Sequence, residues 1–157
     1  MPEPLQNLAA ERTRQGTLNL IRLLRVTPSE KLHWKPLGCG RSVIEQVIEC
    51  ILVNKKWALT LRQGVYTRLS AETVEQVEAT RQDVTQVQHL LQEAAEELAA
   101  AILALPTQQL EGQITAPFGT YSVANCCLLG YWNMVYHEGQ INYIQTLYGD
   151  DTAHVHF

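Results

Sequence analysis

One histidine near the C-terminal end of the chain stands in a pattern that fits either a metal ligand or a core residue. His137 lies in the run YWNMVYHEGQINYIQTLYGD, residues 131–150, where apolar residues recur at helical spacing and Asn133 stands one turn earlier. Residues four apart project from the same face of a helix, so both side chains can reach one partner. Imidazole is a strong ligand for zinc or nickel, whereas a neutral amide oxygen is a weak one. A hydrogen-bonded histidine in the core is the alternative interpretation.

Other residues that could do chemistry have weaker patterns. Four cysteines lack the C-x-x-C spacing of a zinc or redox site and are expected to be small buried thiols: Cys39, Cys50, Cys126 and Cys127. Nothing near Cys50 supplies a base or a cationic environment, so we expect it in the core rather than as a nucleophile. His154 and His156 alternate after two aspartates, where a frayed tail is favoured over a metal site.

Length and composition indicate one compact domain over residues 1–157. The chain has 46% hydrophobic and 18% charged residues, which excludes a disordered chain. No stretch approaches the roughly 18 apolar residues of a membrane span, and the N-terminus lacks the pattern of a secretory signal. We therefore expect a cytoplasmic protein without a membrane partner.

The charges are divided between the two halves of the chain. Residues 1–81 hold all 12 Lys and Arg beside eight acids, whereas residues 82–157 hold eight acids and no Lys or Arg. The basic residues are dispersed, and the net charge of the whole chain is −4. We interpret the division as two oppositely charged halves that fold against each other, and we expect no nucleic-acid partner.

Apolar periodicity predicts four helices separated by loops rich in Gly and Pro. The first covers residues 7–24, and Ser42 with Glu45 forms a capping box at the start of the second. A third helix is expected from Ala71 to Leu105, with Ser70 as its cap. The fourth is expected from Ser122 to about Tyr148.

The expected fold class is an all-α four-helix bundle. Alternation suited to strands is nearly absent, and helices of this length bury their apolar stripes by packing together. Long loops, residues 26–41 and 106–121, precede the second and fourth helices. Within the fourth helix, Gly139 is expected to permit close helix approach and Gln140 to be a packing or loop-tethering amide.

The order of these features resembles the DinB/YfiT-like family of four-helix bundles. The matching segments are WKP at 34–36, RSVIEQVIE at 41–49, AAEELAAAILALP at 94–106 and HEGQINYIQTLYG at 137–149. The His-x-Gly-Gln motif of the last segment is specific, and the other segments match by composition and order. The resemblance covers almost the whole chain.

This resemblance implies a divalent-metal site, usually built from three histidines on the second and fourth helices. The matching positions here are Glu49, Asn133 and His137, so one of the three is histidine. Such a set favours oxygen-loving ions, with lower affinity. Counted at 100° per residue, Glu49 borders the polar face of its helix, where a solvated carboxylate is the ordinary interpretation. In the alternative pocket, Asn133 and Glu49 hydrogen-bond the His137 ring without a metal.

Two functions follow from the resemblance. Substitution at two of three ligand positions favours a bundle with a degenerate metal site, either non-catalytic or weakly metal-binding, that binds an unidentified small ligand or forms oligomers. The alternative is a divalent-metal-dependent thiol transferase or hydrolase that uses Glu49, Asn133 and His137. The cofactor would be zinc, nickel or manganese, or no ion at all. A homodimer is expected in both cases, because relatives commonly pair through helix faces.

Overall fold

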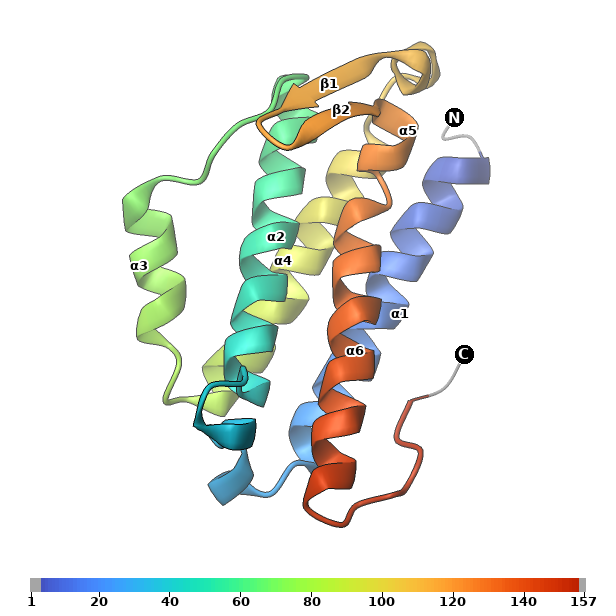
Figure 1. Cartoon of the computed structure of the whole chain (residues 1–157). Coiled ribbons are helices and arrows are strands. Elements are labelled where there is room, and N and C mark those ends of the chain that lie inside the picture. The colour runs from blue at the N-terminus through green and yellow to red at the C-terminus, as the bar shows by residue number, and fades with distance from the viewer. Residues whose placement is uncertain (1–3, 156–157) are drawn as a thin grey trace.

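Four long helices form the body of the protein, as the sequence predicts. The computed structural model describes residues 4–155, and its bundle consists of α1 (Pro4–Val26), α2 (Val43–Gln63), α4 (Val84–Leu103) and α6 (Leu129–Leu147). Helices α4 and α6 each pack between α1 and α2, whereas α1 and α2 lie diagonally opposite and barely touch (Figure 1). The long first connection, which contains the short 3-10 turns Ser29–Lys31 and Pro36–Gly38, makes this diagonal step possible.

The start of α2 follows directly from its sequence. The Ser42 hydroxyl accepts a hydrogen bond from the Glu45 backbone at 3.3 Å, and the Glu45 carboxylate accepts one from the Ser42 backbone at 2.9 Å. This is the predicted capping box, and it satisfies two backbone donors that the helix leaves unpaired. From here α2 buries Ile44, Val47 and Ile51 at helical spacing.

The prediction of one continuous third helix from Ala71 to Leu105 is wrong. The structure has α3 (Ala71–Ala79), a turn, and then α4, with Ser70 capping α3 as expected. At the break, the Asp83 carboxylate accepts hydrogen bonds from the backbone of Thr85 and Gln86 at 3.0 and 3.1 Å. An aspartate that caps a new helix competes with continuation of the old one. As a result α3 lies outside the bundle, beside α2 (Figure 1).

The predicted fourth helix also begins differently. Ser122 caps only the short α5 (Val123–Cys126), and α6 starts after a turn. Ahead of them, a turn, Thr107–Glu111, leads into a hairpin that the sequence did not predict: β1 (Gln113–Ala116) pairs antiparallel with β2 (Gly119–Ser122). Ile114 and Ala116 are buried on one face of β1, but a four-residue strand is too short to show alternation in the sequence.

A glycine lets α6 approach its neighbours closely. A Cβ atom at Gly130 would lie 2.4 Å from the Leu98 side chain of α4 and 2.5 Å from Oδ1 of Asn54 on α2. By contrast, Gly139 is exposed and a Cβ there would meet nothing within 4 Å. The expectation that Gly139 permits close helix approach is therefore wrong, and Gly130 has that role.

The two oppositely charged halves do fold against each other. Arg14 of α1 binds Glu96 of α4 through two nitrogens, and Lys55 of α2 lies 2.9 Å from Glu97 of α4. Both basic residues come from the first half and both acids from the second. Contacts within the bundle therefore account for part of the charge division, because Lys35, Arg41 and Arg81 pair with acids of their own half.

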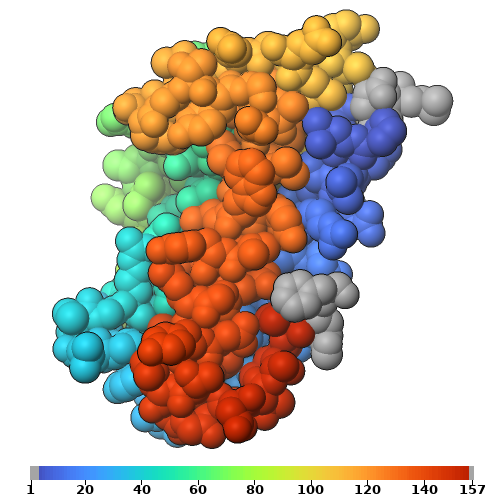
Figure 2. All heavy atoms as spheres, turned by 45° about the vertical axis from the view of Figure 1, so that its right-hand side comes forward, coloured from blue at the N-terminus to red at the C-terminus, as the bar shows by residue number. Residues whose placement is uncertain are grey.

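The outer face of α6 carries large exposed side chains. They are Trp132, Val135, Tyr136, Tyr143 and Leu147. Figure 2 shows this face along the front of the molecule, below the hairpin. It is the surface we would expect a second copy to cover, and the homodimer stays a prediction that light scattering tests. Within residues 4–155, no helix is long and apolar enough to cross a membrane.

Candidate metal centre

The three positions singled out in the sequence meet between α2 and α6. Nε2 of His137 lies 3.2 Å from Oε1 of Glu49, and the Asn133 amide nitrogen donates to the same Glu49 oxygen at 3.4 Å. His137 is completely buried, whereas Glu49 is partly exposed at the border of its helix face. The facing helices thus bring an imidazole, a carboxylate and an amide into one cluster.

Two glutamines hold the His137 ring. Nδ1 of His137 lies 3.1 Å from Oε1 of Gln46 and 2.9 Å from Oε1 of Gln140. The Gln46 amide is oriented by its own nitrogen, which donates to the Arg41 backbone carbonyl at 3.4 Å. Because two oxygens face Nδ1, the proton belongs on that nitrogen. In the neutral ring, Nε2 therefore carries a lone pair on the side of Glu49.

Two buried polar atoms of the cluster lack a hydrogen bond. Nε2 of His137 comes close to Glu49 without hydrogen-bonding alignment, and Oδ1 of Asn133 has no partner. In the neutral ring a lone pair beside a carboxylate is unfavourable, and burial without a partner costs about 1–3 kcal/mol. Either a proton on Nε2, which makes an ion pair with Glu49, or a metal cation between the two atoms relieves this cost. The metal-free pocket stays a prediction: Glu49 lies within ion-pair distance of the ring, Asn133 bonds Glu49 rather than the ring, and Gln46 and Gln140 bond Nδ1.

The spacing and donor types fit a divalent cation. Two atoms bonded to one ion at about 2.1 Å lie about 3.0 to 3.4 Å apart in octahedral or tetrahedral geometry. The observed separation of His137 Nε2 and Glu49 Oε1 is 3.2 Å. Rotating the Asn133 amide by 180° would place its oxygen where its nitrogen now lies, 3.4 Å from Oε1 of Glu49. A hydrogen-bonded Nδ1 is also the usual support of a metal-binding histidine.

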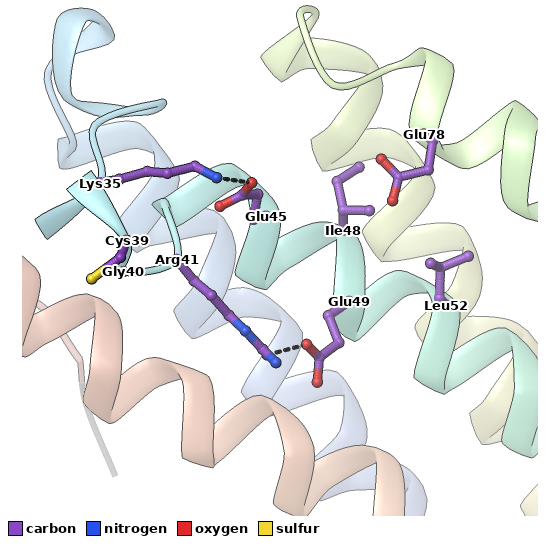
Figure 3. Close-up of a pocket in the computed structure, with 9 residues that line it drawn as sticks. All are labelled: Lys35, Cys39, Gly40, Arg41, Glu45, Ile48, Glu49, Leu52 and Glu78. Atoms are coloured by element: carbon purple, nitrogen blue, oxygen red, sulfur yellow. Dashed lines mark hydrogen bonds and ion pairs between the residues drawn. The ribbon is translucent and has the colours of Figure 1, made fainter.

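An arginine binds the outer side of Glu49. Arg41, from the loop before α2, forms an ion pair with Oε2 of Glu49, and Figure 3 shows the two side chains meeting at the edge of a cavity of about 380 Å³. The guanidinium neutralises part of the carboxylate charge. A cation at Glu49 would consequently be held more weakly than by a free carboxylate.

The cysteines are not part of the cluster. Cys50 follows Glu49 but is buried, and burial together with nearby carboxylates raises the pKa of its thiol well above its ordinary value. It is therefore a protonated core thiol, as predicted. Cys126 and Cys127 are buried too, but Cys39 is exposed at the rim of the cavity beside Arg41. The expectation of a buried thiol is wrong there, because the loop passes outside the bundle.

A buried carboxylate lies next to His137 but belongs to the other side of α6. Glu138 is 5% exposed, and its Oε2 accepts a hydrogen bond from Asn19 of α1 at 3.3 Å. Burial raises the pKa of Glu138 to about 7. Successive residues of a helix point about 100° apart, so His137 faces α2 while Glu138 faces α1.

Among the described residues, no three His, Cys, Asp or Glu side chains gather as a metal site. The cluster therefore depends on the Asn133 amide as its third donor. Gln46 was missed in the sequence; its position one turn before Glu49 is the signal that could have found it. In the tail, Nε2 of His154 lies 2.7 Å from an Asp150 oxygen, and His156 lies outside the described residues.

Comparisons with known proteins establish the family and agree with the fold. The family model described as the DinB superfamily matches residues 9–141. YfiT from Bacillus subtilis, described as a probable metal-dependent hydrolase with an unusual four-helix bundle topology, is 16% identical, with a TM-score of 0.75 over 95% of this chain and 90% of that one. Comparison with curated proteins gives no match.

A mutant of the mycothiol-dependent maleylpyruvate isomerase is a second similar structure. It is 15% identical, with a TM-score of 0.64 over 88% of this chain. The match spans 61% of the isomerase chain. At such identities the two likenesses establish the fold, and the chemistry has to be argued from this chain's own residues.

Proposed function

Because this chain belongs to the DinB superfamily, we propose that it binds small molecules at a divalent cation held weakly between α2 and α6. The ligands would be Nε2 of His137, the carboxylate of Glu49 and the amide oxygen of Asn133. The observation that supports this proposal most strongly is the buried Nε2 atom of His137, which has no hydrogen bond and lies 3.2 Å from Oε1 of Glu49.

The weakness of the site follows from its donors. Only one ligand is an imidazole, the amide is neutral, and Arg41 already pairs with Glu49. Carboxylate and amide oxygens favour manganese, whereas the imidazole favours zinc or nickel. Three protein ligands leave coordination positions for a small molecule, and Glu49 lines two separate cavities through which one could enter.

A second candidate is catalysis by the same cluster. A divalent ion, when bound, polarises an oxygen or sulfur group of the molecule that reaches it. YfiT is described as a probable metal-dependent hydrolase and the isomerase as mycothiol-dependent, which favours hydrolysis or thiol transfer. Hydrolysis of p-nitrophenyl acetate that metal stimulates, and that His137→Ala abolishes, would support catalysis. A rate of hydrolysis that neither added metal nor His137→Ala changes would reject it.

The metal centre can be tested on protein purified without a histidine tag. We expect calorimetric titration with manganese, zinc or nickel chloride to give one site per chain. His137→Ala should lower the affinity at least about tenfold, because the only imidazole ligand is lost. His89→Ala is the matched control, since its imidazole is exposed on α4, and His154→Ala tests the tail.

A gain of binding separates the metal role from simple unfolding. Asn133→His places two imidazoles four residues apart on α6, and we expect it to raise the affinity at least about tenfold. The proposal fails if the wild type and all four variants bind metal equally, or if the wild type binds none. It also fails if His154→Ala, rather than His137→Ala, removes the binding.

A further inference from the structure

A second cavity adjoins Glu49 and has a different character from the one beside Arg41. It measures about 400 Å³ and lies between α2, residues 64–70, α3 and the tip of the hairpin. Leu52 and Val53 of α2 and Phe118 of the hairpin supply apolar walls. The cavity is open to solvent, and its apolar walls with a few polar groups match the lining of small-molecule sites.

Two cations line this cavity without ion-pair partners. Neither Lys56 nor Arg68 comes within ion-pair distance of a carboxylate in the described part of the chain, whereas the neighbouring Lys55 pairs with Glu93 and Glu97. Lys56 is also half-buried, and burial lowers the pKa of its ammonium group more than the Glu49 carboxylate of the same cavity raises it. Such a cation gains free energy when an anion joins it away from water.

Aromatic rings hold the rim of the cavity in place. Tyr66 packs edge-on between Trp57 and Phe118, with ring centroids 6.3 and 5.7 Å apart. The Lys56 ammonium lies 5.8 Å from the ring centroids of both Trp57 and Phe118. Phe118 nevertheless stays 55% exposed. The rings therefore place a cation and an open apolar surface next to each other before any ligand arrives.

We propose that this cavity binds a small organic acid, with its carboxylate against Lys56 and Arg68 and its apolar body against Leu52, Val53 and Phe118. A monoanion with an apolar body matches the two cations and the hydrophobic walls that line this cavity. The far end of the molecule lies toward Glu49, which lines the same cavity. The inference goes beyond the proposed function, because it requires no ion at Glu49.

Octanoate and its neutral analogue octanamide test the inference on metal-free protein in EDTA. Calorimetric titration should show octanoate binding at least about fivefold more tightly than octanamide, since one ion pair in a partly buried site contributes about 1 kcal/mol. In the double variant Lys56→Met/Arg68→Gln, this preference should fall below about twofold while octanamide binding is kept.

Matched variants distinguish the cavity from general surface charge. Lys31 also lies over two rings, 5.2 Å from the Trp34 centroid and 5.6 Å from that of Tyr148, but outside the cavity. Lys31→Met combined with Arg12→Gln should therefore leave the preference for octanoate unchanged. Phe118→Ala, which removes an exposed ring, should weaken both ligands about threefold or more.

The outcomes separate this inference from the metal centre. Equal affinity for octanoate and octanamide in the wild type, no binding of either, or loss of preference in the Lys31→Met/Arg12→Gln control would overturn it. A separate titration of the protein with manganese chloride, after the EDTA has been removed, tests only the proposed ion. If manganese does not bind, the metal centre is rejected. The acid site stands if octanoate still binds more tightly than octanamide and this preference still depends on Lys56 and Arg68.

Discussion

The α1/α4 and α2/α6 interfaces lie on opposite sides of the same bundle and are built differently. At the first, Ala9 is buried among Leu98 and Ile102, and the Gln6 amide donates to the Leu105 carbonyl at 2.7 Å. At the second, Asn54, Asn133 and His137 each have a buried polar atom without a hydrogen bond. Within residues 4–155, none of the unpartnered buried side-chain polar atoms lies on α1 or α4. Glu138 and Gln145 of α6 also hold one each, on the side of α6 that faces Asn19 and Thr27.

This difference separates an interface that stabilises the fold from one that is available for binding. Small apolar residues and satisfied polar groups stabilise a helix pair without leaving anything to bind. Buried donors and acceptors without partners cost free energy, and such costs are typical of sites that a ligand completes. Three substitutions test this division, from the largest expected effect to the smallest.

Gly130→Ala should have the largest effect on stability. The new methyl group would lie 2.4 Å from Leu98 and 2.5 Å from Asn54, so α6 must move away from α2 and α4. We expect the free energy of unfolding in urea to fall by about 2 to 3 kcal/mol. Gly139→Ala is the matched control; its site is open, and it should gain about 0.5 to 1 kcal/mol. Equal effects would contradict the close contact at Gly130.

Gln6→Leu should destabilise the opposite interface without touching the metal centre. Removing the amide leaves the Leu105 carbonyl without that donor and should cost about 1 to 2 kcal/mol. Gln92→Leu, at an exposed position of α4, should change stability by less than about 0.5 kcal/mol. Metal affinity should stay the same in both variants. A change of affinity in Gln6→Leu would show that the two interfaces are coupled.

Glu45→Gln should have the smallest effect and should depend on pH. Lys35, 2.6 Å away, and the Ser42 backbone lower the pKa of Glu45 from 4.5 to about 2. Between these values the unfolded chain binds more protons, so the stabilisation is present above about pH 4.5 and is lost as pH falls toward 2.

Because Glu45 is partly exposed, we expect the substitution to cost only about 1 kcal/mol at pH 7. Urea titrations of both proteins at several pH values measure this difference, which should disappear near pH 2. Glu96→Gln, in the exposed pair of α1 and α4, should cost less at pH 7. A difference that persists in acid would show that the Glu45 charge does not stabilise α2.

Features that depend on nearby residues were predictable from the sequence. The Ser42 capping box, the apolar stripe of α2 and the four-residue spacing of Asn133 and His137 are all set within one or two helical turns. The break at Asp83 is also local, but an apolar stripe that continues from Val77 to Val84 concealed it. The hairpin before α5 was concealed because its strands are only four residues long.

Contacts between distant residues decided the rest. The spacing on α6 determines that Asn133 and His137 share a face, because helical hydrogen bonds repeat every turn whatever surrounds them. Only packing could decide that this face meets Glu49 and Gln46, 84 residues from Asn133 and 91 from His137 respectively. The rotation of α6 against α2 depends on close contacts such as Gly130 with Asn54. Those contacts leave the Nε2 atom of His137 buried and without a hydrogen bond.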